Sequence, residues 1–399
     1  MKRLLILGGS RYIIPVIEKA HKLGAYVITC DYLPDNIGHK FSDEYHNVSI
    51  VDKEKVLDLA KKLHVDGIVS FATDPGVTVA AYVAEKMGLP GCPYESVKIL
   101  QNKDKFRRFL KEHGFNVPKS QGFSSKDEAL LGIANFSFPV IVKPVDSAGS
   151  KGVSRVDNIN GLDSSLEYAF EHSMSGRIII EDFLEQVGCS SDTDCFSVND
   201  ILVFASFNCQ YFDDNASNPY TPASYSWPSD MPLSAQEELR SELQRLIKLL
   251  HLGTSIYNVE TRVCTDGKPY IMEVSPRGGG NRLSEMLFKA SGGDLIEANI
   301  RSALGMPVQN LHDPLYQGAW AEYIIHSNKT GKFKELIIDD DFAQKHVVEC
   351  DLWVNKDDEV HDFTGANETI GTLVLKFDGI EEARVALKNM KKYIKVMVE

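Results

Sequence analysis

The sequence has no long run of apolar residues. Across its 399 residues, no segment approaches the roughly 18 uninterrupted apolar residues that a membrane-spanning helix needs. The apolar stretch near the N-terminus stops at Gly8-Gly9, too early for a signal peptide. The seven cysteines are an odd number without a CxxC pair, which indicates neither a disulfide framework nor a zinc site. These absences predict a cytoplasmic protein with ordinary thiols and no membrane partner.

The sequence also lacks a block of basic residues. Its formal net charge is −13, and an acidic chain without a basic segment is a poor candidate for binding nucleic acid or an anionic membrane surface. An anionic small molecule would therefore need isolated lysine and arginine residues around it. We expect small-molecule partners and no nucleic acid.

Two common phosphate-binding signatures are missing. Gly8-Gly9-Ser10 is followed by Arg11 and Ile13, so no GxGxxG is present, and a tight turn explains these glycines better than NAD binding does. The glycine loop at residues 146–152 does not have the GxxxxGK[ST] pattern of a Walker loop. An oxidoreductase is therefore disfavoured.

The first hundred residues alternate between predicted strands and predicted helices. The strands are predicted over residues 4–7, 26–30 and 67–71, and the helices over residues 15–23, 53–63 and 77–87. This alternation is typical of an α/β domain with a parallel sheet, whose carboxyl strand ends form the ligand-binding edge. Asp74 follows one of these strands.

The rest of the chain has a different pattern. Helices are predicted over residues 103–114, 234–251 and 295–304, and the last ninety residues are β-rich with a closing helix near 380–392. A polar segment at residues 208–232 is too long for an idle connection, and we expect a lid or a binding loop there.

Two lysines and a glycine loop suggest phosphate binding. Lys143 ends an apolar strand predicted at residues 139–143, directly before the loop at residues 146–152. Glycines let backbone N–H groups turn toward an anion, and a lysine beside them supplies a point charge. Lys103, at the start of a predicted helix, is a second candidate.

Two glutamates suggest a metal site. Glu260 and Glu273 lie on predicted strands joined by a turn at residues 265–268. In an antiparallel pair they would lie near each other, where two carboxylates repel unless a cation such as nucleotide-bound magnesium separates them. Ser275 and Arg277 return to the same face, and offer an oxygen and a guanidinium that can bind phosphate.

With these residues in this order, the sequence resembles the ATP-grasp superfamily. Within it, the sequence looks most similar to the branch of biotin carboxylase, the carboxylating enzymes of purine synthesis and the amino-acid ligases. The resemblance covers nearly the whole chain and implies an α/β (α+β) fold of four parts. These are an N-terminal parallel α/β-sheet domain (residues 1–98), a small lid subdomain (99–184), a larger mixed-sheet catalytic subdomain (185–310) and a β-rich C-terminal part (311–399).

The resemblance implies a role for each motif residue. Lys103 and Lys143 would hold the phosphates of ATP, under a loop formed by Ser147, Gly149, Ser150 and Gly152. Adenine would be lined, mostly by backbone, by Glu181, Asp182, Phe183 and Leu184. Mg²⁺, or Mn²⁺ in its place, would be bound by Glu260, Glu273 and Ser275. Arg277 and Lys143 would be the catalytic residues that stabilise the transferring phosphoryl group.

Two positions depart from the family pattern. The family often has asparagine where this sequence has Ser275, and serine offers a weaker oxygen ligand. A glutamate that commonly contacts the ribose would fall near Ser190, and Asp192 and Glu185 are both open as its substitute.

The implied reaction is the ATP-dependent joining of a carboxylate to an amine. The carboxylate would attack the γ-phosphate, and an amine would attack the resulting acyl phosphate, releasing ADP and phosphate. Arg282 and Asp74 are the candidate substrate contacts. An amino acid or small peptide-like acid is the first candidate substrate and bicarbonate the second; a nucleotide-binding protein without catalysis is the rival. A homodimer is the expected assembly.

Overall fold

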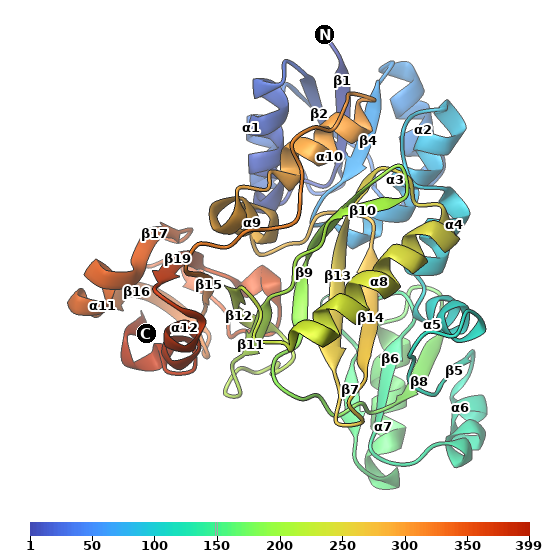
Figure 1. Ribbon diagram of the computed structural model, residues 1–399, viewed down its shortest axis with the longest axis vertical. Coiled ribbons are helices and arrows are strands. Elements are labelled where there is room, and N and C mark those ends of the chain that lie inside the picture. Colours follow the sequence, from blue (N-terminus) through green and yellow to red (C-terminus); the bar gives the residue numbers. More distant parts are fainter. Residues whose placement is uncertain (148, 150) are drawn as a thin grey trace.

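A parallel sheet with helices on both faces forms the N-terminal part of the computed structural model, which describes residues 1–147, 149 and 151–399 (Figure 1). Its strand order is β3-β2-β1-β4. Alternate residues of β1 face opposite sides, so Leu4 and Ile6 join one buried cluster and Leu5 and Leu7 join another. The elements are β1 (Arg3–Leu7), α1 (Ile14–Lys22), β2 (Tyr26–Asp31), β3 (Glu44–Asn47), α2 (Lys53–Lys62), β4 (Gly67–Ser70) and α3 (Asp74–Met87).

A small antiparallel sheet follows, with the strand order β5-β8-β6-β7. Its apolar residues pack against α6 and α7 in a separate buried cluster. The elements are β5 (Ser120–Phe123), α6 (Lys126–Gly132), β6 (Val140–Pro144), β7 (Ser154–Val156), α7 (Leu162–Glu171) and β8 (Ile178–Asp182). Two helices lead into it, α4 (Tyr94–Leu100) and α5 (Lys103–Glu112).

The central sheet has the order β10-β9-β13-β14 and is also antiparallel. The long helix α8 (Leu233–Leu250) packs across it, and Figure 1 shows this helix in front of the strands. Every third or fourth residue of α8 is apolar and buried, which is the spacing of one helix face. The strands are β9 (Ser191–Val198), β10 (Ile201–Phe204), β13 (Ser255–Val263) and β14 (Pro269–Ser275).

Two sheets make up the C-terminal part. The larger has the order β11-β12-β15-β19-β17 and the smaller the order β18-β16-β20. Their strands are β11 (Cys209–Phe212), β12 (Pro222–Trp227), β15 (Ala319–Ile325), β16 (Gly331–Ile338), β17 (Val347–Leu352), β18 (Glu359–Val360), β19 (Gly371–Phe377) and β20 (Ile394–Val398). The helices here are α11 (Asp340–His346) and α12 (Ile380–Leu387).

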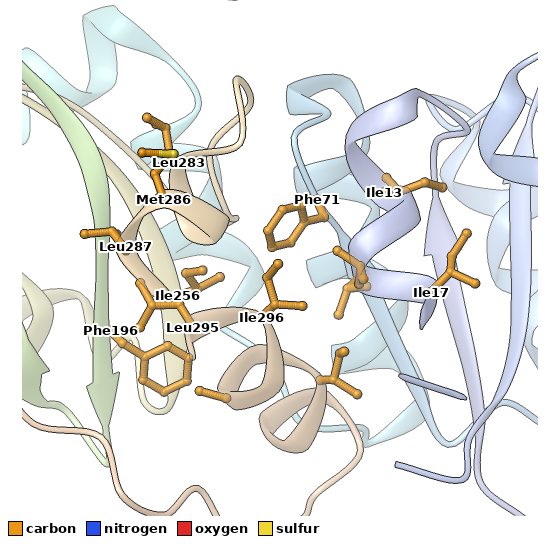
Figure 2. Packing of buried hydrophobic residues seen from close by; sticks show 14 of the residues in the cluster. Ile13, Ile17, Phe71, Phe196, Ile256, Leu283, Met286, Leu287, Leu295 and Ile296 are labelled. Atoms are coloured by element: carbon orange, nitrogen blue, oxygen red, sulfur yellow. The ribbon is translucent and has the colours of Figure 1, made fainter. Parts of the chain in front are cut away.

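Helices α9 (Leu283–Ser291) and α10 (Leu295–Ala303) join the N-terminal sheet to the central one. Figure 2 shows Ile296 of α10 between Phe71, which follows β4, and Phe196 of β9. One buried cluster therefore spans segments from both sheets. This shared core fixes the position of the glycine turn before α9 relative to the N-terminal strand ends.

The expected α/β class, with a parallel N-terminal sheet, is confirmed, and the sheets that follow it are antiparallel. The expectation of a lid or binding loop over residues 208–232 is wrong in one respect, because strands β11 and β12 lie there. β11 pairs with β12, and β12 joins the sheet through β15, almost a hundred residues later, which no local pattern reveals. The boundaries of the four domains stay predictions, and the pairing of β12 with β15 crosses the one at residue 310.

Membrane-spanning segments were not expected. Among the described residues, no helix is both long enough and apolar enough to cross a bilayer.

Candidate active site

Lys143 lies in a buried group of three charges. Its Nζ lies 2.6 Å from Glu181 Oε2, and Arg107 Nε lies 2.7 Å from Glu181 Oε1. Lys143 and Glu181 come from the neighbouring strands β6 and β8, while Arg107 comes from α5. Only 1% of the Arg107 side chain and 3% of the Glu181 side chain are exposed. Charges buried to this degree are stable only when their partners are charged as well.

Burial and the neighbouring charges of this group shift the pKa values of Glu181 and Lys143. Burial opposes the ionisation of Glu181, but the charges of Arg107 and Lys143 more than offset it and hold its pKa at about 2. Burial lowers the pKa of Lys143, while the charge of Glu181 opposes this shift. Arg107 also donates from Nη1 to the carbonyl oxygen of Met272 at 2.7 Å, which ties α5 to strand β14 of the central sheet.

Lys103 lies between the small sheet and the central sheet. As the first residue of α5, it follows Asn102, whose side chain caps the helix by accepting from Lys105 N. The Lys103 ammonium donates to the carbonyl oxygen of Ser147 at 3.0 Å and lies 3.4 Å from Glu273 Oε2. It therefore contacts both the glycine loop and the hairpin of β13 and β14, called the acidic hairpin because it carries Glu260 and Glu273.

The glycine loop is fixed at its base. Asp146 accepts from the backbone N–H groups of Met174 and Ser175, and Ser147 Oγ donates to the carbonyl oxygen of Lys151. Gly152 has a φ of +75°, and a Cβ there would lie 2.7 Å from Pro144 Cγ, so only glycine fits. Gly149 also has a positive φ. Ser150 lies outside the described residues.

The four residues expected around adenine lie at the end of β8 and in the segment that follows it. The Phe183 amide donates to the carbonyl oxygen of Pro139, and the Arg155 guanidinium lies 4.2 Å from the centre of the Phe183 ring. Asp182 Oδ1 is buried with no hydrogen-bond partner among the described residues, and burial raises the pKa of this carboxyl. Leu184 is partly buried. The Glu181 side chain instead holds Lys143 and Arg107.

Three carboxylates form a row across the central sheet. Glu260 on β13 is the register partner of Glu273 on β14 and of Asp192 on β9. Arg262 Nη2 lies 2.6 Å from Glu260 Oε1, and Lys103 is the ion-pair partner of Glu273. Burial, and then the charge of Glu260, raise the pKa of Asp192 to about 7. Such a row is the arrangement that a divalent cation stabilises.

Arg277 and Asp74 form a bidentate ion pair near this row of carboxylates. Arg277 Nε donates to Asp74 Oδ1 at 2.6 Å and Nη2 to Oδ2 at 2.7 Å. Ser275 Oγ donates to the same Asp74 Oδ1 and accepts from Gln101 Nε2. Asp74 opens α3, directly after β4, so the expected ligand edge of the N-terminal sheet does meet the acidic hairpin. Neither the metal role of Ser275 nor the substrate role of Asp74 is tested by these contacts.

Arg282 belongs to a neighbouring cluster. Its Nη2 lies 2.5 Å from Glu349 Oε1 and 3.2 Å from Glu285 Oε1, and Nη1 donates to Thr372 Oγ1. Its role as a substrate contact stays a prediction.

Sequence patterns missed Arg107 and the position of Asp192. Arg107 lies four residues after Lys103, one helical turn along the same face, and this spacing was an available signal. Asp192 was one of two substitutes for a ribose-contacting glutamate, and the register places it beside Glu260 instead. Glu185, the other substitute, is exposed.

We expect Asp192→Asn to stabilise the ligand-free protein at pH 8. Between about pH 4 and pH 7 the folded chain keeps a proton on Asp192 that the unfolded chain has released, so this carboxyl lowers stability as the pH rises. The free energy of unfolding should increase by about 2 kcal/mol at pH 8 and by less at pH 5. Urea denaturation of both proteins at the two pH values measures this, and an equal change at both would contradict it.

Comparison with known proteins agrees with this geometry. A family model described as an ATP-grasp domain matches residues 100–281. The formate-dependent phosphoribosylglycinamide formyltransferase of Burkholderia thailandensis is 28% identical over 323 residues, covering 77% of this chain and 76% of that protein. The carbamoyl phosphate synthase large chain of Thermotoga petrophila is 27% identical over 241 residues, covering 60% of this chain, and the chain spans only 21% of that relative's length.

A solved structure shows the same fold over the whole chain. The L-amino acid ligase from Bacillus licheniformis matches with a TM-score of 0.82 at 19% identity, covering 100% of this chain and 99% of that one. The resemblance drawn from the sequence motifs is thereby confirmed for the segment that carries them, and residues 100–281 match the ATP-grasp domain family.

Proposed function

We propose that this protein is an ATP-dependent ligase that phosphorylates a substrate carboxylate and couples it to an amine, releasing ADP and phosphate. The observation that carries the proposal is that cations and carboxylates face each other across one site. Lys103 lies 3.4 Å from Glu273, and Glu273 belongs to the row that continues through Glu260 to Asp192. Phosphoryl transfer needs mostly such positioning and charge neutralisation.

The residues fit ATP with magnesium. Lys143 lies directly before the glycine loop, and Lys103 donates to the carbonyl oxygen of Ser147 in it. Burial lowers the pKa of Lys143, and the charges of Arg107 and Lys103 add to this shift, so an anion bound beside the lysines would relieve the repulsion. The carboxylate row repels itself in the same way unless a cation neutralises it. Bound Mg²⁺, or Mn²⁺, would supply charge neutralisation at the phosphate oxygens when held by Glu260 and Glu273. The metal role of Ser275 is part of this proposal, although its hydroxyl already bonds Asp74 and Gln101.

The chain's own residues then have distinct tasks. Lys103 and Lys143 orient the terminal phosphates, and the loop of Ser147, Gly149, Ser150 and Gly152 excludes water from them. The backbone of Asp182, Phe183 and Leu184 lines the base. Arg277, which is held by Asp74, would supply a fixed charge that stabilises the phosphoryl group as it moves to the substrate carboxylate.

An amine acceptor is favoured by the relatives. The solved structure of similar fold is named as an amino acid ligase, and the formyltransferase relative acts on a phosphoribosylglycinamide. An amino acid or small peptide-like acid is therefore the first substrate class, and Arg282 and Asp74 are its proposed contacts. A bicarbonate-using carboxylase is the second candidate, favoured only by the fold that biotin carboxylases share with this chain.

The products of ATP distinguish these reactions. The chain should be incubated with ATP, Mg²⁺ and pooled amino acids, with and without bicarbonate, and the nucleotides separated by chromatography. We expect ADP, because the lysines and Arg277 converge on the terminal phosphates and attack would fall on the γ-phosphate.

Four outcomes separate the alternatives. ADP that requires amino acids supports the ligase, and ADP formed only with bicarbonate replaces it with a carboxylase. AMP as the main product overturns the proposed mechanism. If ATP binds but no nucleotide product forms with any pool, the protein is a nucleotide-binding protein without catalysis.

The expected homodimer remains a prediction, and measurement of the molecular mass in solution would test it.

A further inference from the structure

Glu322 is a buried carboxylate that has no hydrogen-bond partner in the described part of the chain. It lies on β15, in the middle of the larger C-terminal sheet, and its exposed fraction is 0%. Among the residues that the structure describes, neither of its carboxylate oxygens has a hydrogen-bond partner. An unpaired carboxylate removed from water costs several kcal/mol, so such a group is seldom kept for the fold alone.

The neighbouring cations are already used by other acids. Arg282 is held by Glu285 and Glu349, and Lys289 Nζ lies 2.9 Å from Glu349 Oε2. Within this cluster of Arg282, Glu285, Lys289, Glu322 and Glu349, two cations therefore face three carboxylates. The carboxylate in excess is Glu322, which leaves room for one further positive charge.

The charges around Glu322 confirm that these groups lie close together. Burial raises the pKa of Glu322 well above its usual range, the charge of Arg282 opposes this shift, and the charges of Glu285 and Glu349 add to it. Without a ligand, burial therefore disfavours the ionised form of this carboxyl. An incoming cation would favour the ionised form and replace the missing partner.

Glu322 also lies beside the proposed phosphoryl-transfer site. Its register partner on β12 is Tyr225, whose hydroxyl donates to Asp192 Oδ2 at 3.4 Å. Asn281 donates to the Tyr225 hydroxyl and accepts from the Tyr12 hydroxyl. One tyrosine thus links the strand position beside Glu322 to the carboxylate row, so a cationic group bound at Glu322 would lie on the Asp192 side of that row.

We propose that Glu322 binds the ammonium group of an amino-containing substrate, so that the enzyme selects substrates carrying a protonated amine close to the reacting carboxylate. This inference rests on the proposed ligase function and names its substrate class more narrowly. A single ammonium supplies one positive charge and three donors, which matches one carboxylate in excess.

The test compares a pool of α-amino acids with a matched pool of the corresponding 2-hydroxy acids. Thermal unfolding is first measured with a non-hydrolysable ATP analogue and Mg²⁺, a readout that needs no turnover. We expect the amino acids, and not the hydroxy acids, to raise the Tm of the wild-type protein. With the same amine acceptor added to both pools, ADP formation should favour the amino-acid pool by at least about 100-fold, or about 2.7 kcal/mol.

Glu322→Gln keeps the shape of the side chain and removes its charge. We expect KM for the active amino acid to rise at least about 10-fold with a smaller change in kcat, because ammonium binding is lost and not phosphoryl transfer. ATP-analogue binding should be unchanged and the Tm of the ligand-free variant equal or higher, which shows that it folds. Glu297→Gln, on the outer ion pair of α10 with Arg301, is the matched control and should behave as wild type.

The outcomes keep the inference separate from the ligase function. Equal ADP formation from the hydroxy acids, or an unchanged KM in Glu322→Gln, overturns the ammonium site while the ligase stands. Amino-acid stabilisation that Glu322→Gln abolishes, without any ADP, supports the site while the ligase reaction fails. If neither pool stabilises the wild-type protein, the ammonium site is wrong.

Discussion

Replacing Glu273 by glutamine should reduce phosphate release by about 10³-fold or more. Glu273 is the acid of the row that is most open to solvent and that also contacts Lys103, so it can reach both a metal ion and the phosphates. Glutamine keeps the shape and removes the charge that would hold the cation, and about 4 kcal/mol of transition-state stabilisation corresponds to this factor. Phosphate release with saturating ATP and Mg²⁺ measures the change.

The fold should survive this substitution. The Glu273 side chain is 38% exposed, so its amide can bond water and the Tm should stay close to that of the wild type. Glu381→Gln, on an exposed ion pair with Arg384 far from the row, is the matched control. Wild-type phosphate release by Glu273→Gln in Mg²⁺ would show that Glu260 and Glu273 are not the metal site.

Glu181→Gln should lower the free energy of unfolding by about 3–5 kcal/mol. The substitution leaves Lys143 and Arg107 as two buried cations without a counter-charge, and breaking a buried ion pair by removing one partner costs about this much. Burial already lowers the pKa of Lys143, and loss of Glu181 would lower it further. Urea denaturation at pH 7 measures the loss of stability.

A double variant identifies the cause. Arg107→Met with Glu181→Met removes one charge of each sign and leaves the net charge of the group as it was. We expect the double variant to be more stable than Glu181→Gln, because only one buried cation then lacks a partner. A Glu181→Gln protein within about 1 kcal/mol of the wild type would mean that water reaches the group and that its charges are not coupled.

Local patterns were sufficient where chemistry and secondary structure lie in one segment. Lys143 at the end of a strand, the glycine loop after it and the hairpin of Glu260 and Glu273 are each contained in a few residues. The register of that hairpin followed from its short turn, and the structure pairs the two glutamates. The parallel sheet at the N-terminus followed in the same way from its alternation of strands and helices.

Contacts between distant segments were not predictable. The segment of β11 and β12 was expected to be a lid or a binding loop, because β15, the strand through which β12 joins the sheet, lies beyond α8, the central hairpin and α10. The pairing of Asp74 with Arg277 joins residues 203 positions apart, and it depends on how α9 and α10 seat the glycine turn against the N-terminal sheet. No local sequence pattern distinguishes an arginine without an ion-pair partner from one paired with such a carboxylate.

The sequence by itself determined the superfamily, the order of its motifs and the residues from which a phosphate and metal site could be built. Those depend on backbone-scale requirements, such as glycine at a positive φ and carboxylates on paired strands, which act within short segments. Only the tertiary structure decided which charged side chains lie next to one another. It placed Arg107 beside Glu181, completed the carboxylate row with Asp192 and buried Glu322 where no residue that the structure describes is its hydrogen-bond partner. The reason is that burial and ion pairing depend on packing between segments, and packing is fixed only when the whole core forms.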